Sequence, residues 1–364
     1  MRAWDVALLV SLLTSNVQAA FVPSARWTLI SPTTMLNARH HHFARFSRRL
    51  TTSRWSAAAS STSTLDISTE LSPQKLQEML ETAQAAARAA GAVIRQHVGC
   101  CSEAAEECDI KYSIKDIVTV YDQQAQDAVH EIIRAQYPHH AFLGEEDVAA
   151  GGAASEQALL DILQSSESDF LWICDPIDGT ANFASGLELC AVTMAVVYNA
   201  TPLIGVIYDP HRDEMYSTIR GQGAFLNDRP IQVAQAIASA REAIVNAGCP
   251  ADPNAFATSM RGVLALNRQT RGLRIIACSA LTLAWIAAGR LTAHFGYDLS
   301  SWDLVAGALL VQEAGGRVTD LDGSDYKLTT RNMLCSNGAV HDQILKILKE
   351  ADAVSFSRSE LQKE

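Results

Sequence analysis

Four short segments of this 364-residue chain gather carboxylates in apolar or turn-forming surroundings, whereas most of its 40 acidic residues are scattered. The segments are residues 115–122, 142–147, 172–183 and 301–307. Carboxylate oxygens are hard ligands that suit Mg²⁺, and Mg²⁺ commonly shares the oxygens of a substrate phosphate. The residue types in these segments therefore indicate a divalent cation beside a phosphate.

The third of these segments is the most informative. The apolar run 170–174 predicts a buried strand that ends at Asp175, where a proline turns the chain, and Asp178 follows three residues later. Ionising two carboxylates in one cleft costs much free energy unless a cation lies between them. Gly179 lets a ligand approach the backbone, and Thr180 is expected to open a helix whose N–H groups bind phosphate. An ordinary turn is the alternative, but the other three segments favour a site.

In type and order, these segments resemble the motifs of the inositol monophosphatase family of Mg²⁺-dependent, lithium-sensitive phosphatases. The resemblance covers roughly residues 72–350. The matching motifs are Val118-Thr119 with Asp122, Gly144-Glu145-Glu146, Asp175-Pro176-Ile177-Asp178-Gly179-Thr180 with Asn182-Phe183, and Trp302-Asp303 with Ala306-Gly307 and Glu313-Ala314-Gly315-Gly316. Each motif alone is a weak signal, whereas four motifs in the correct order are a specific one.

The resemblance implies that two or three Mg²⁺ ions bind to this chain. Glu145, Asp175 and the backbone carbonyl of Ile177 would hold the first ion. Asp175, Asp178 and Asp303 would hold the second, and a third, weaker ion would touch Glu145. The ions would supply a hydroxide-like nucleophile near neutral pH and would neutralise charge at the leaving oxygen.

The resemblance also implies catalytic and phosphate-binding roles. Thr180, paired with Asp122, would orient and deprotonate the attacking water, and Gly179 and Thr180 would grip the phosphate. No covalent enzyme intermediate is implied. This half of the pattern is intact, so the sequence supports a phosphoric monoester hydrolase.

The half of the site that would hold the alcohol departs from the family pattern. The family usually has an acid seven residues before its second-signature aspartate, where it binds substrate hydroxyls, but here that position is Gly296. Asp298, two residues further on, is the expected replacement. Ala277-Cys278-Ser279-Ala280 stands where the family has Gly-Ser/Thr-Ala-Ala, and Ser279 is expected to line the substrate.

The family's default substrate, myo-inositol monophosphate, is the substrate expected here. Histidinol phosphate is one alternative. A sugar (bis)phosphate is another, and Arg268, Arg271 or Arg274 could then take a second phosphate. A non-enzyme alternative is a metal-binding regulatory relative, which predicts the loss of a metal or catalytic residue, and none is lost. The resemblance also implies a homodimer.

Hydrophobic residues make up 48% of the chain, which is enough for a sizeable core. Apolar periodicity predicts helices over 72–98, 123–137, 279–288, 304–314 and 340–349. Short apolar or alternating runs predict strands over 170–174, 191–198, 203–208, 214–219, 223–226, 243–246 and 293–295. Because strands and helices do not alternate strictly, an α+β fold is favoured over a doubly wound sheet. The resemblance implies a layered αβαβα sandwich.

The N-terminal region is typical of a targeting sequence. Residues 1–20 read as a signal peptide, whose apolar stretch is too short to span a bilayer. Residues 21–64 are rich in Arg, Ser, Thr and Ala and lack Asp and Glu, which is the composition of a disordered transit peptide. Together they resemble the bipartite presequences of algae and predict import into a plastid stroma, with secretion as the alternative. A phosphatase domain over 65–352 and a flexible tail over 353–364 are expected to follow.

Charge and cysteine content further limit the classes of protein to which this chain can belong. Residues 1–64 hold seven arginines and one acid, whereas the remainder holds 22 basic and 39 acidic residues. Such an acidic body argues against a nucleic-acid partner, and no apolar run is long enough for a transmembrane helix. The eight cysteines include no CxxC motif. Cys100, Cys101 and Cys108 are expected to be free thiols, with a redox switch as the alternative.

Overall fold

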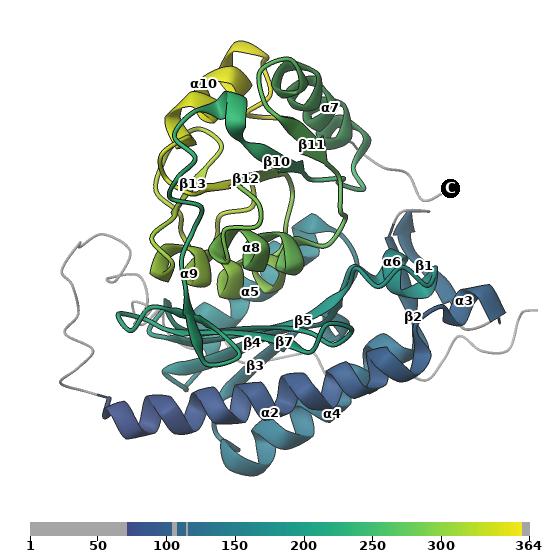
Figure 1. Cartoon of the computed structure of the whole chain (residues 1–364). Helices are drawn as coiled ribbons and strands as arrows, with labels where there is room; N and C mark the ends of the chain where they lie inside the picture. Colours follow the sequence, from purple (N-terminus) through teal and green to yellow (C-terminus); the bar gives the residue numbers. More distant parts are fainter. Residues whose placement is uncertain (1–70, 104–107, 114–115, 359–364) are drawn as a thin grey trace, which may run out of the picture. The chain divides into compact units, whose positions relative to one another are not determined.

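The computed structural model describes residues 71–103, 108–113 and 116–358, all within the unit Thr52–Glu364. The signal peptide and transit peptide expected over 1–20 and 21–64 lie outside the described residues. In the described part, helices and sheets alternate in layers (Figure 1).

Two long helices, α2 (Pro73–His97) and α4 (Val120–Gln136), form the first layer. Helix α2 begins where the sequence predicts, because the side chain of Ser72 accepts a hydrogen bond from the N–H of Lys75 and proline follows at the first helical position. Its buried face is rich in alanine, so it packs closely on the sheet. At Gly91 an added Cβ would lie only 2.5 Å from the ring of Tyr208.

The second layer is a seven-stranded sheet in the order β3-β4-β5-β6-β7-β8-β9. Its strands are β3 (Ala141–Gly144), β4 (Phe170–Asp178), β5 (Ala191–Tyr198), β6 (Thr201–Asp209), β7 (Glu214–Ile219), β8 (Ala224–Leu226) and β9 (Arg229–Ile231). Strands β3 and β4 are parallel, and the others form an antiparallel meander. The strand predicted to end at Asp175 instead continues to Asp178, because its pairing with β5 resumes after a register shift between these two residues.

The middle layer contains α5 (Gly152–Ser165), α8 (Ser279–Ala287) and α9 (Ser301–Glu313). Helices α8 and α9 are apolar on almost every side because sheets cover them from two directions. Helix α9 begins three residues earlier than predicted. The backbone N–H of Ser300 donates to the Asp303 carboxylate at 2.7 Å, so Asp303 caps the helix from its first turn.

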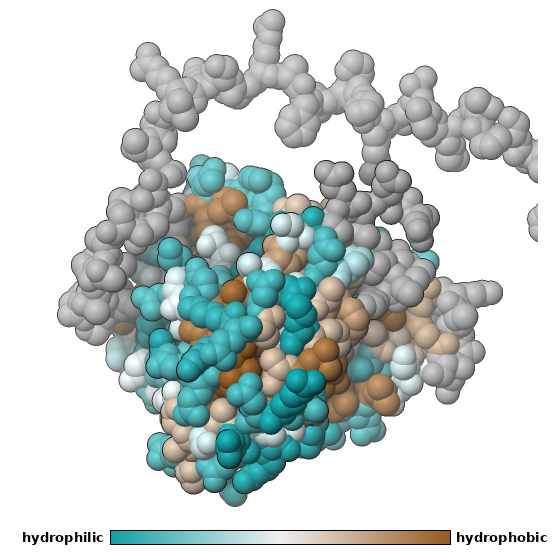
Figure 2. All heavy atoms as spheres, turned by 90° about the horizontal axis from the view of Figure 1, so that it is seen from above, coloured by the Kyte–Doolittle hydropathy of each residue, from teal (hydrophilic) through white to brown (hydrophobic). Residues whose placement is uncertain are grey.

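The second sheet and two outer helices complete the layers. The sheet order is β11-β10-β12-β14-β13, with β10 (Ile244–Ala247), β11 (Gly272–Arg274), β12 (Ala293–Gly296), β13 (Arg317–Asp320) and β14 (Met333–Ser336). Helices α7 (Pro253–Asn267) and α10 (His341–Glu350) cover its outer side. This arrangement confirms the α+β class and the αβαβα layering. Hydrophilic side chains cover most of the face shown in Figure 2, and hydrophobic ones lie between them.

Short elements connect these layers. They are α3 (Cys100–Glu103), the hairpin of β1 (Cys108–Ser113) and β2 (Asp116–Thr119), the 3₁₀ helix η2 (Glu145–Asp147), α6 (Thr180–Ala184) and η3 (Ala240–Glu242). Among the described residues, none of the helices combines the length and the apolar composition that a membrane span requires.

The C-terminal segment differs from the flexible tail expected from residue 353 onward. Ala353 is buried, and its carbonyl accepts a hydrogen bond from the hydroxyl of Tyr297 at 2.6 Å. The ring of Phe356 meets Tyr297 edge-on, and Arg358 forms ion pairs with Glu156 and Asp298. These tertiary contacts hold the segment as far as Arg358, and residues 359–364 lie outside the described part.

Candidate active site

Three of the predicted metal ligands meet in one buried cluster. Ligand oxygens of Asp175, Asp178 and Asp303 all lie within 4.8 Å of one another. The first two come from the irregular end of β4 and the third from the first turn of α9. Burial, followed by the charges of neighbouring carboxylates, raises the pKa of all three side chains, that of Asp178 to about 7. An all-oxygen set with this much mutual repulsion fits a hard divalent cation.

Local backbone contacts orient the cluster. One oxygen of Asp175 accepts the N–H of Ile177 at 2.9 Å, which holds the bulge of β4. Asp178 accepts the N–H of Ala280 in the first turn of α8, and the thiol of Cys278 lies 3.5 Å from the same carboxylate. The positive end of the α8 dipole therefore faces this carboxylate. Each carboxylate is thus pre-positioned by the chain itself.

Glu145 lies beside this cluster, at the end of the parallel strand β3. Its carboxylate accepts a hydrogen bond from Lys111 Nζ at 3.0 Å, and Glu146 accepts one at 2.8 Å. Burial alone would lower the pKa of Lys111, but the two carboxylates outweigh it and raise that pKa above its usual range. Burial and the nearby Glu145 raise the pKa of Glu146 to about 7. Lys111 was not predicted, because one lysine in a short polar strand carries no sequence signal.

The predicted catalytic pair also meets in the structure. The hydroxyl of Thr180 lies 3.2 Å from Asp122 Oδ1 and 3.1 Å from the carbonyl oxygen of Ile177. The other Asp122 oxygen accepts the N–H of Thr119 at 2.8 Å and its hydroxyl at 2.7 Å. Burial raises the pKa of Asp122 to about 6, although these hydrogen bonds oppose the rise. Asp122 is thus a buried carboxylate held against a threonine hydroxyl.

Gly179 occupies a left-handed conformation at φ 91°, between β4 and α6. An added Cβ there would lie 2.9 Å from the carbonyl oxygen of Leu189, so only glycine fits without a shift. The helix expected after it is present but spans only Thr180–Ala184. The side chain of Asn182 secures this turn by donating to the carbonyl oxygens of Leu189 and Ile276, both at 2.9 Å.

One cavity of about 620 Å³ joins the two halves of the site. Glu145, Asp178, Asp303, Gly179 and Thr180 line it on the metal side. We call one further part of the lining the alcohol wall, and it consists of residues 246–252, 277, 294, 297–299, 331 and 358. Ser279 also lines the cavity, as the first residue of α8. The phosphate ester and its alcohol would therefore occupy one continuous space.

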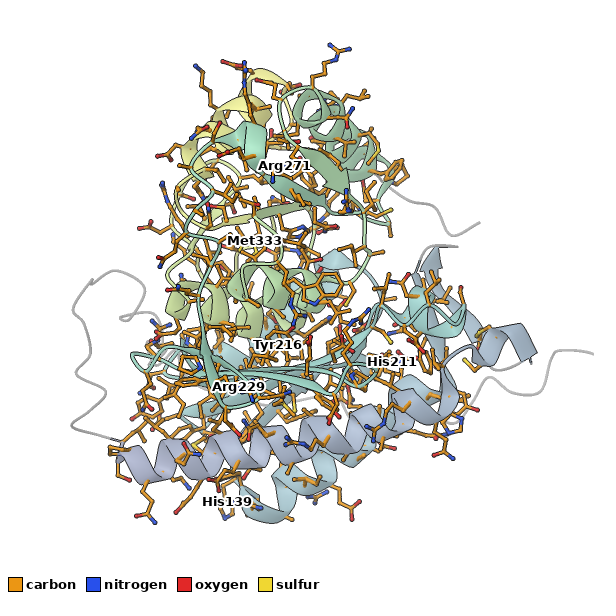
Figure 3. The ribbon with its side chains drawn as sticks, in the orientation of Figure 1. His139, His211, Tyr216, Arg229, Arg271 and Met333 are labelled. Atoms are coloured by element: carbon orange, nitrogen blue, oxygen red, sulfur yellow. A yellow bond between two sulfur atoms is a disulfide. The ribbon has the colours of Figure 1, made fainter. Side chains whose placement is uncertain are left out.

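The alcohol wall differs from the sequence expectation at two points. Asp298 lines the cavity, but its Oδ1 is held by Arg331 at 3.1 Å and by Arg358 at 2.8 Å. The carboxylate expected to bind substrate hydroxyls is thus engaged by two guanidinium groups. Arg268, Arg271 and Arg274, suggested for a second phosphate, do not line the cavity. Figure 3 shows Arg271 beside β11, in the outer part of the second sheet.

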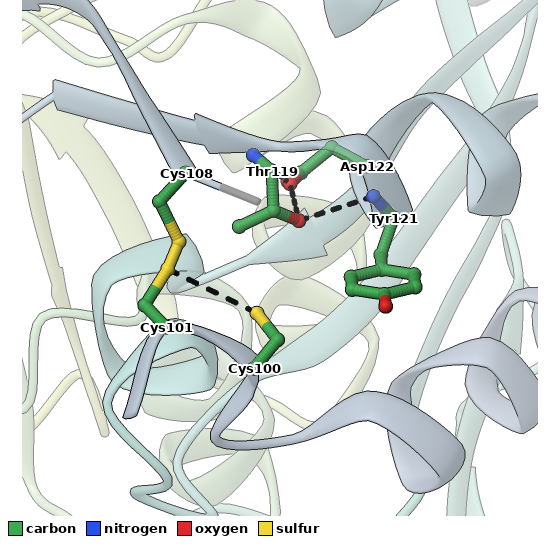
Figure 4. The surroundings of a disulfide bond; sticks show 6 residues. All are labelled: Cys100, Cys101, Cys108, Thr119, Tyr121 and Asp122. Atoms are coloured by element: carbon green, nitrogen blue, oxygen red, sulfur yellow. Dashed lines mark hydrogen bonds between the residues drawn. A yellow bond between two sulfur atoms is a disulfide. The ribbon is translucent and has the colours of Figure 1, made fainter. Parts of the chain in front are cut away.

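The cysteines near β1 require a correction. Cys101 and Cys108 form a disulfide, with their Cα atoms 6.1 Å apart, instead of two free thiols (Figure 4). The fold places the start of β1 within bonding range of α3, which spacing along the chain does not reveal. Cys100 remains a thiol, with its sulfur 4.0 Å from that of Cys101. Cys108 is also the cross-strand partner of Thr119, which holds Asp122.

Buried carboxylates suited to a divalent cation, beside a threonine–aspartate pair in a layered αβαβα fold, define the class of metal-dependent phosphatases. Residues 75–353 match the model of the Inositol monophosphatase family. The chain therefore belongs to this family, and it is a phosphatase.

Similar proteins agree with this placement. An inositol monophosphatase of Mesembryanthemum crystallinum is 32% identical over 285 residues, covering 76% of this chain and 98% of that protein. A fructose-1,6-bisphosphatase/inositol-1-monophosphatase of Thermotoga maritima is 33% identical over 240 residues, covering 66% of this chain and 85% of that protein. The solved inositol monophosphatase structure from Anabaena superposes with a TM-score of 0.62 at 31% identity, covering 76% of this chain and 96% of the other.

Proposed function

We propose that this protein hydrolyses myo-inositol monophosphate to inositol and phosphate with the help of Mg²⁺. The observation that carries the proposal is the set of three carboxylates whose oxygens lie within 4.8 Å of one another, next to the Thr180–Asp122 pair. The same cavity continues into a wall that can hold an alcohol. The similar protein of Mesembryanthemum crystallinum, by its name, acts on the same substrate.

Asp175, Asp178 and Asp303, with Glu145 and the carbonyl oxygen of Ile177, would hold two or three Mg²⁺ ions. Such ions supply charge neutralisation at the phosphate and make water a nucleophile near neutral pH.

The chain itself moves the proton. The hydroxyl of Thr180 reaches both Asp122 Oδ1 and the carbonyl oxygen of Ile177. When it donates to Asp122 Oδ1, the lone pairs of Oγ1 are available to a water molecule in the cavity. When that water attacks phosphorus, its proton passes to Thr180 Oγ1 as the threonine proton passes to Asp122. Thr119 keeps Asp122 oriented through two hydrogen bonds. Gly179 lines the cavity just before α6, where the phosphate would bind.

Phosphate release by the purified chain from residue 65 onward tests the proposal. The assay compares myo-inositol 1-phosphate, fructose 1,6-bisphosphate and histidinol phosphate, each with Mg²⁺ and with EDTA. We expect Mg²⁺-dependent release that is fastest from the inositol ester and is lost in Asp175→Asn. A folded protein that releases phosphate from none of these esters would contradict the proposal and favour a regulatory, metal-binding relative.

A sugar bisphosphate is the second candidate. The Thermotoga maritima relative carries fructose-1,6-bisphosphatase in its name, and Arg331 and Arg358 stand on the alcohol wall of this chain. Both guanidinium groups are already paired with Asp298, which weakens their attraction for a second phosphate. We therefore rank this candidate below the inositol ester.

Two further proposals concern the protein in the cell. Composition supports a bipartite presequence over residues 1–64 and import into a plastid, with secretion as the alternative. A fluorescent protein fused to residues 1–64 should collect in plastids of an algal host, and its secretion would contradict this. The family resemblance supports a homodimer of the mature chain, which light scattering in solution can test.

A further inference from the structure

A histidine on the alcohol wall has no role in the chemistry described above. His294 and Gly296 lie two residues apart on β12, so their Cβ positions face the same side of the sheet. Phe295 between them faces the outer helices, because an added Cβ on Gly262 of α7 would lie 2.9 Å from its ring. His294 and Gly296 therefore face inward, and His294 lines the cavity.

The neighbours of His294 decide which ring nitrogen carries the proton. Asn246, the partner of His294 on β10, accepts the N–H of Ile276 through Oδ1 at 3.1 Å. Its amide nitrogen therefore points at His294 Nδ1, 3.0 Å away, and can only donate. The backbone carbonyl oxygen of Asn246 also faces Nδ1 but lies farther away, at 3.3 Å. Nδ1 accepts the shorter bond from the amide, because a proton on Nδ1 would face the amide donor at 3.0 Å, so the ring proton is on Nε2. Burial lowers the pKa of His294 to about 4, which keeps the ring neutral near pH 7.

This Nε2–H group is buried and has no hydrogen-bond partner among the described residues. An unpaired buried donor is costly and rare in folded proteins. An added Cβ at Gly296 would lie 3.0 Å from Nε2 and 2.7 Å from Leu299 Cδ1. The glycine thus makes room for the imidazole, and Leu299, which lines the cavity, lies beside the same space.

Each carboxylate of the alcohol wall already accepts hydrogen bonds through its Oδ1 atom. Asp298 holds Arg331 and Arg358, and Asp252 accepts the N–H groups of Asn254 and Ala255 at the start of α7. The alcohol wall therefore presents the Nε2–H group of His294 to a substrate, close to Gly296, where the family pattern has an acid. A donor of this kind requires an acceptor oxygen on the alcohol.

We propose that His294 determines which alcohol this phosphatase accepts, by donating a hydrogen bond from Nε2 to an oxygen of the alcohol once Leu299 has rotated aside. The inference rests on the proposed function, because the alcohol is the leaving group of the phosphate ester. It assigns the substrate class to polyols and other alcohols rich in acceptor oxygens. A cationic alcohol such as histidinol offers an ammonium group that cannot accept this bond.

The test compares two esters and two variants. His294→Leu keeps an apolar volume without a donor, whereas His294→Gln keeps a donor at similar reach. With myo-inositol 1-phosphate we expect His294→Leu to raise KM about 10-fold and change kcat little, because one hydrogen bond is lost. With phenyl phosphate, whose alcohol has no further oxygen, KM should not change. His294→Gln should restore most of the KM for the inositol ester.

Equal KM changes for both esters would indicate a structural role for His294 and overturn the inference, as would no change for either. If the unaltered enzyme hydrolyses neither ester with Mg²⁺, the proposed function fails, and the inference fails with it. Should His294→Leu not fold, Gly296→Ala provides the same test, because its Cβ would displace the imidazole. A folded Gly296→Ala protein with an unaltered KM for the inositol ester would also overturn the inference.

Discussion

The hydroxyl oxygen of Thr180 lies 3.2 Å from Asp122 Oδ1, although 58 residues separate the two along the chain. Asp122 is in the first turn of α4, and Thr180 follows the irregular end of β4. The bulge of β4 and the cap of α4 must both form before this contact exists. The distance within this pair is therefore a sensitive measure of whether the candidate site has formed.

Removal of the acceptor should disable catalysis without unfolding the chain. Asp122→Asn keeps the shape of the side chain but cannot take up the threonine proton, so we expect kcat to fall about 10²- to 10⁴-fold with little change in KM. Thr180→Ser should retain most activity, whereas Thr180→Val should not. Steady-state kinetics with Mg²⁺ measures these effects. Asp127→Asn, an exposed position on the same helix, is the control, and an equal loss of activity there would contradict the assignment.

Divalent metal should stabilise the protein more at pH 8 than at pH 5. In the metal-free protein, burial and repulsion raise the pKa of Asp178 to about 7, whereas an unfolded aspartate titrates near 3.9. Between these values the folded state binds more protons, so its stability falls as pH rises through this window. At pH 8 the carboxylates are more fully ionised and repel one another most strongly, and bound Mg²⁺ relieves this repulsion. We expect a Tm increase of about 5 °C there at saturating Mg²⁺ and a smaller one at pH 5.

Because buried histidines also change stability with pH, the test should compare the Tm with Mg²⁺ to the Tm without Mg²⁺ at each pH. Burial lowers the pKa of His294 and His341 to about 4, so their contribution to stability falls as pH falls below their unfolded values. This trend opposes that of the carboxylates but is common to both samples. Asp303→Asn should raise the Tm of the metal-free protein at pH 8 and abolish the response to Mg²⁺. A response to Mg²⁺ that is equal at both pH values would refute the role of the cluster.

Lys111 should stabilise the metal-free protein. Its ammonium group neutralises two carboxylates, and the Glu146 side chain is only 8% exposed. Lys111→Met leaves both charges without a counter-ion, so we expect the free energy of unfolding to fall by about 3 kcal/mol. Urea titration in EDTA measures this loss. Lys346→Met, which removes an exposed ion pair on α10, should cost less than about 1 kcal/mol, and a similar cost for both variants would contradict the prediction.

The Cys101–Cys108 disulfide should link redox state to catalysis. Alkylation of the denatured protein should add six labels without reductant and eight with it. Because Cys108 pairs with Thr119 across the hairpin, reduction should loosen the hold on Asp122 and lower kcat by up to about 10-fold. The double variant Cys101→Ser, Cys108→Ser should show the lower kcat and no response to reductant. Eight labels without reductant would rule out the pairing.

Residue types and spacing predicted three of the carboxylates that the structure brings together. Asp175, Asp178 and Gly179 are neighbours in sequence behind an apolar strand, so local chain geometry brings them together. The predicted helices and strands also agree with the structure wherever one apolar period dominates, as in α2, β5 and β7. Helices α5 and α7 were missed, although Asp252 and Pro253 form an ordinary helix start before α7. Their apolar periodicity is weak because each packs only one narrow face.

The tertiary structure alone decided the alcohol wall. Asp298 seemed available in sequence, but Arg358 from the C-terminal segment and Arg331 after β13 converge on it. The sequence did not single out His294. Only the pairing of β10 with β12 shows that its Nε2 atom is buried without a hydrogen-bond partner among the described residues. In the same way, the disulfide depends on the tertiary structure, which places Cys101 of α3 beside Cys108 of β1. Short-range motifs identify the carboxylates because residue type and local spacing mark each of them, whereas the alcohol wall depends on contacts between distant segments that only packing brings together.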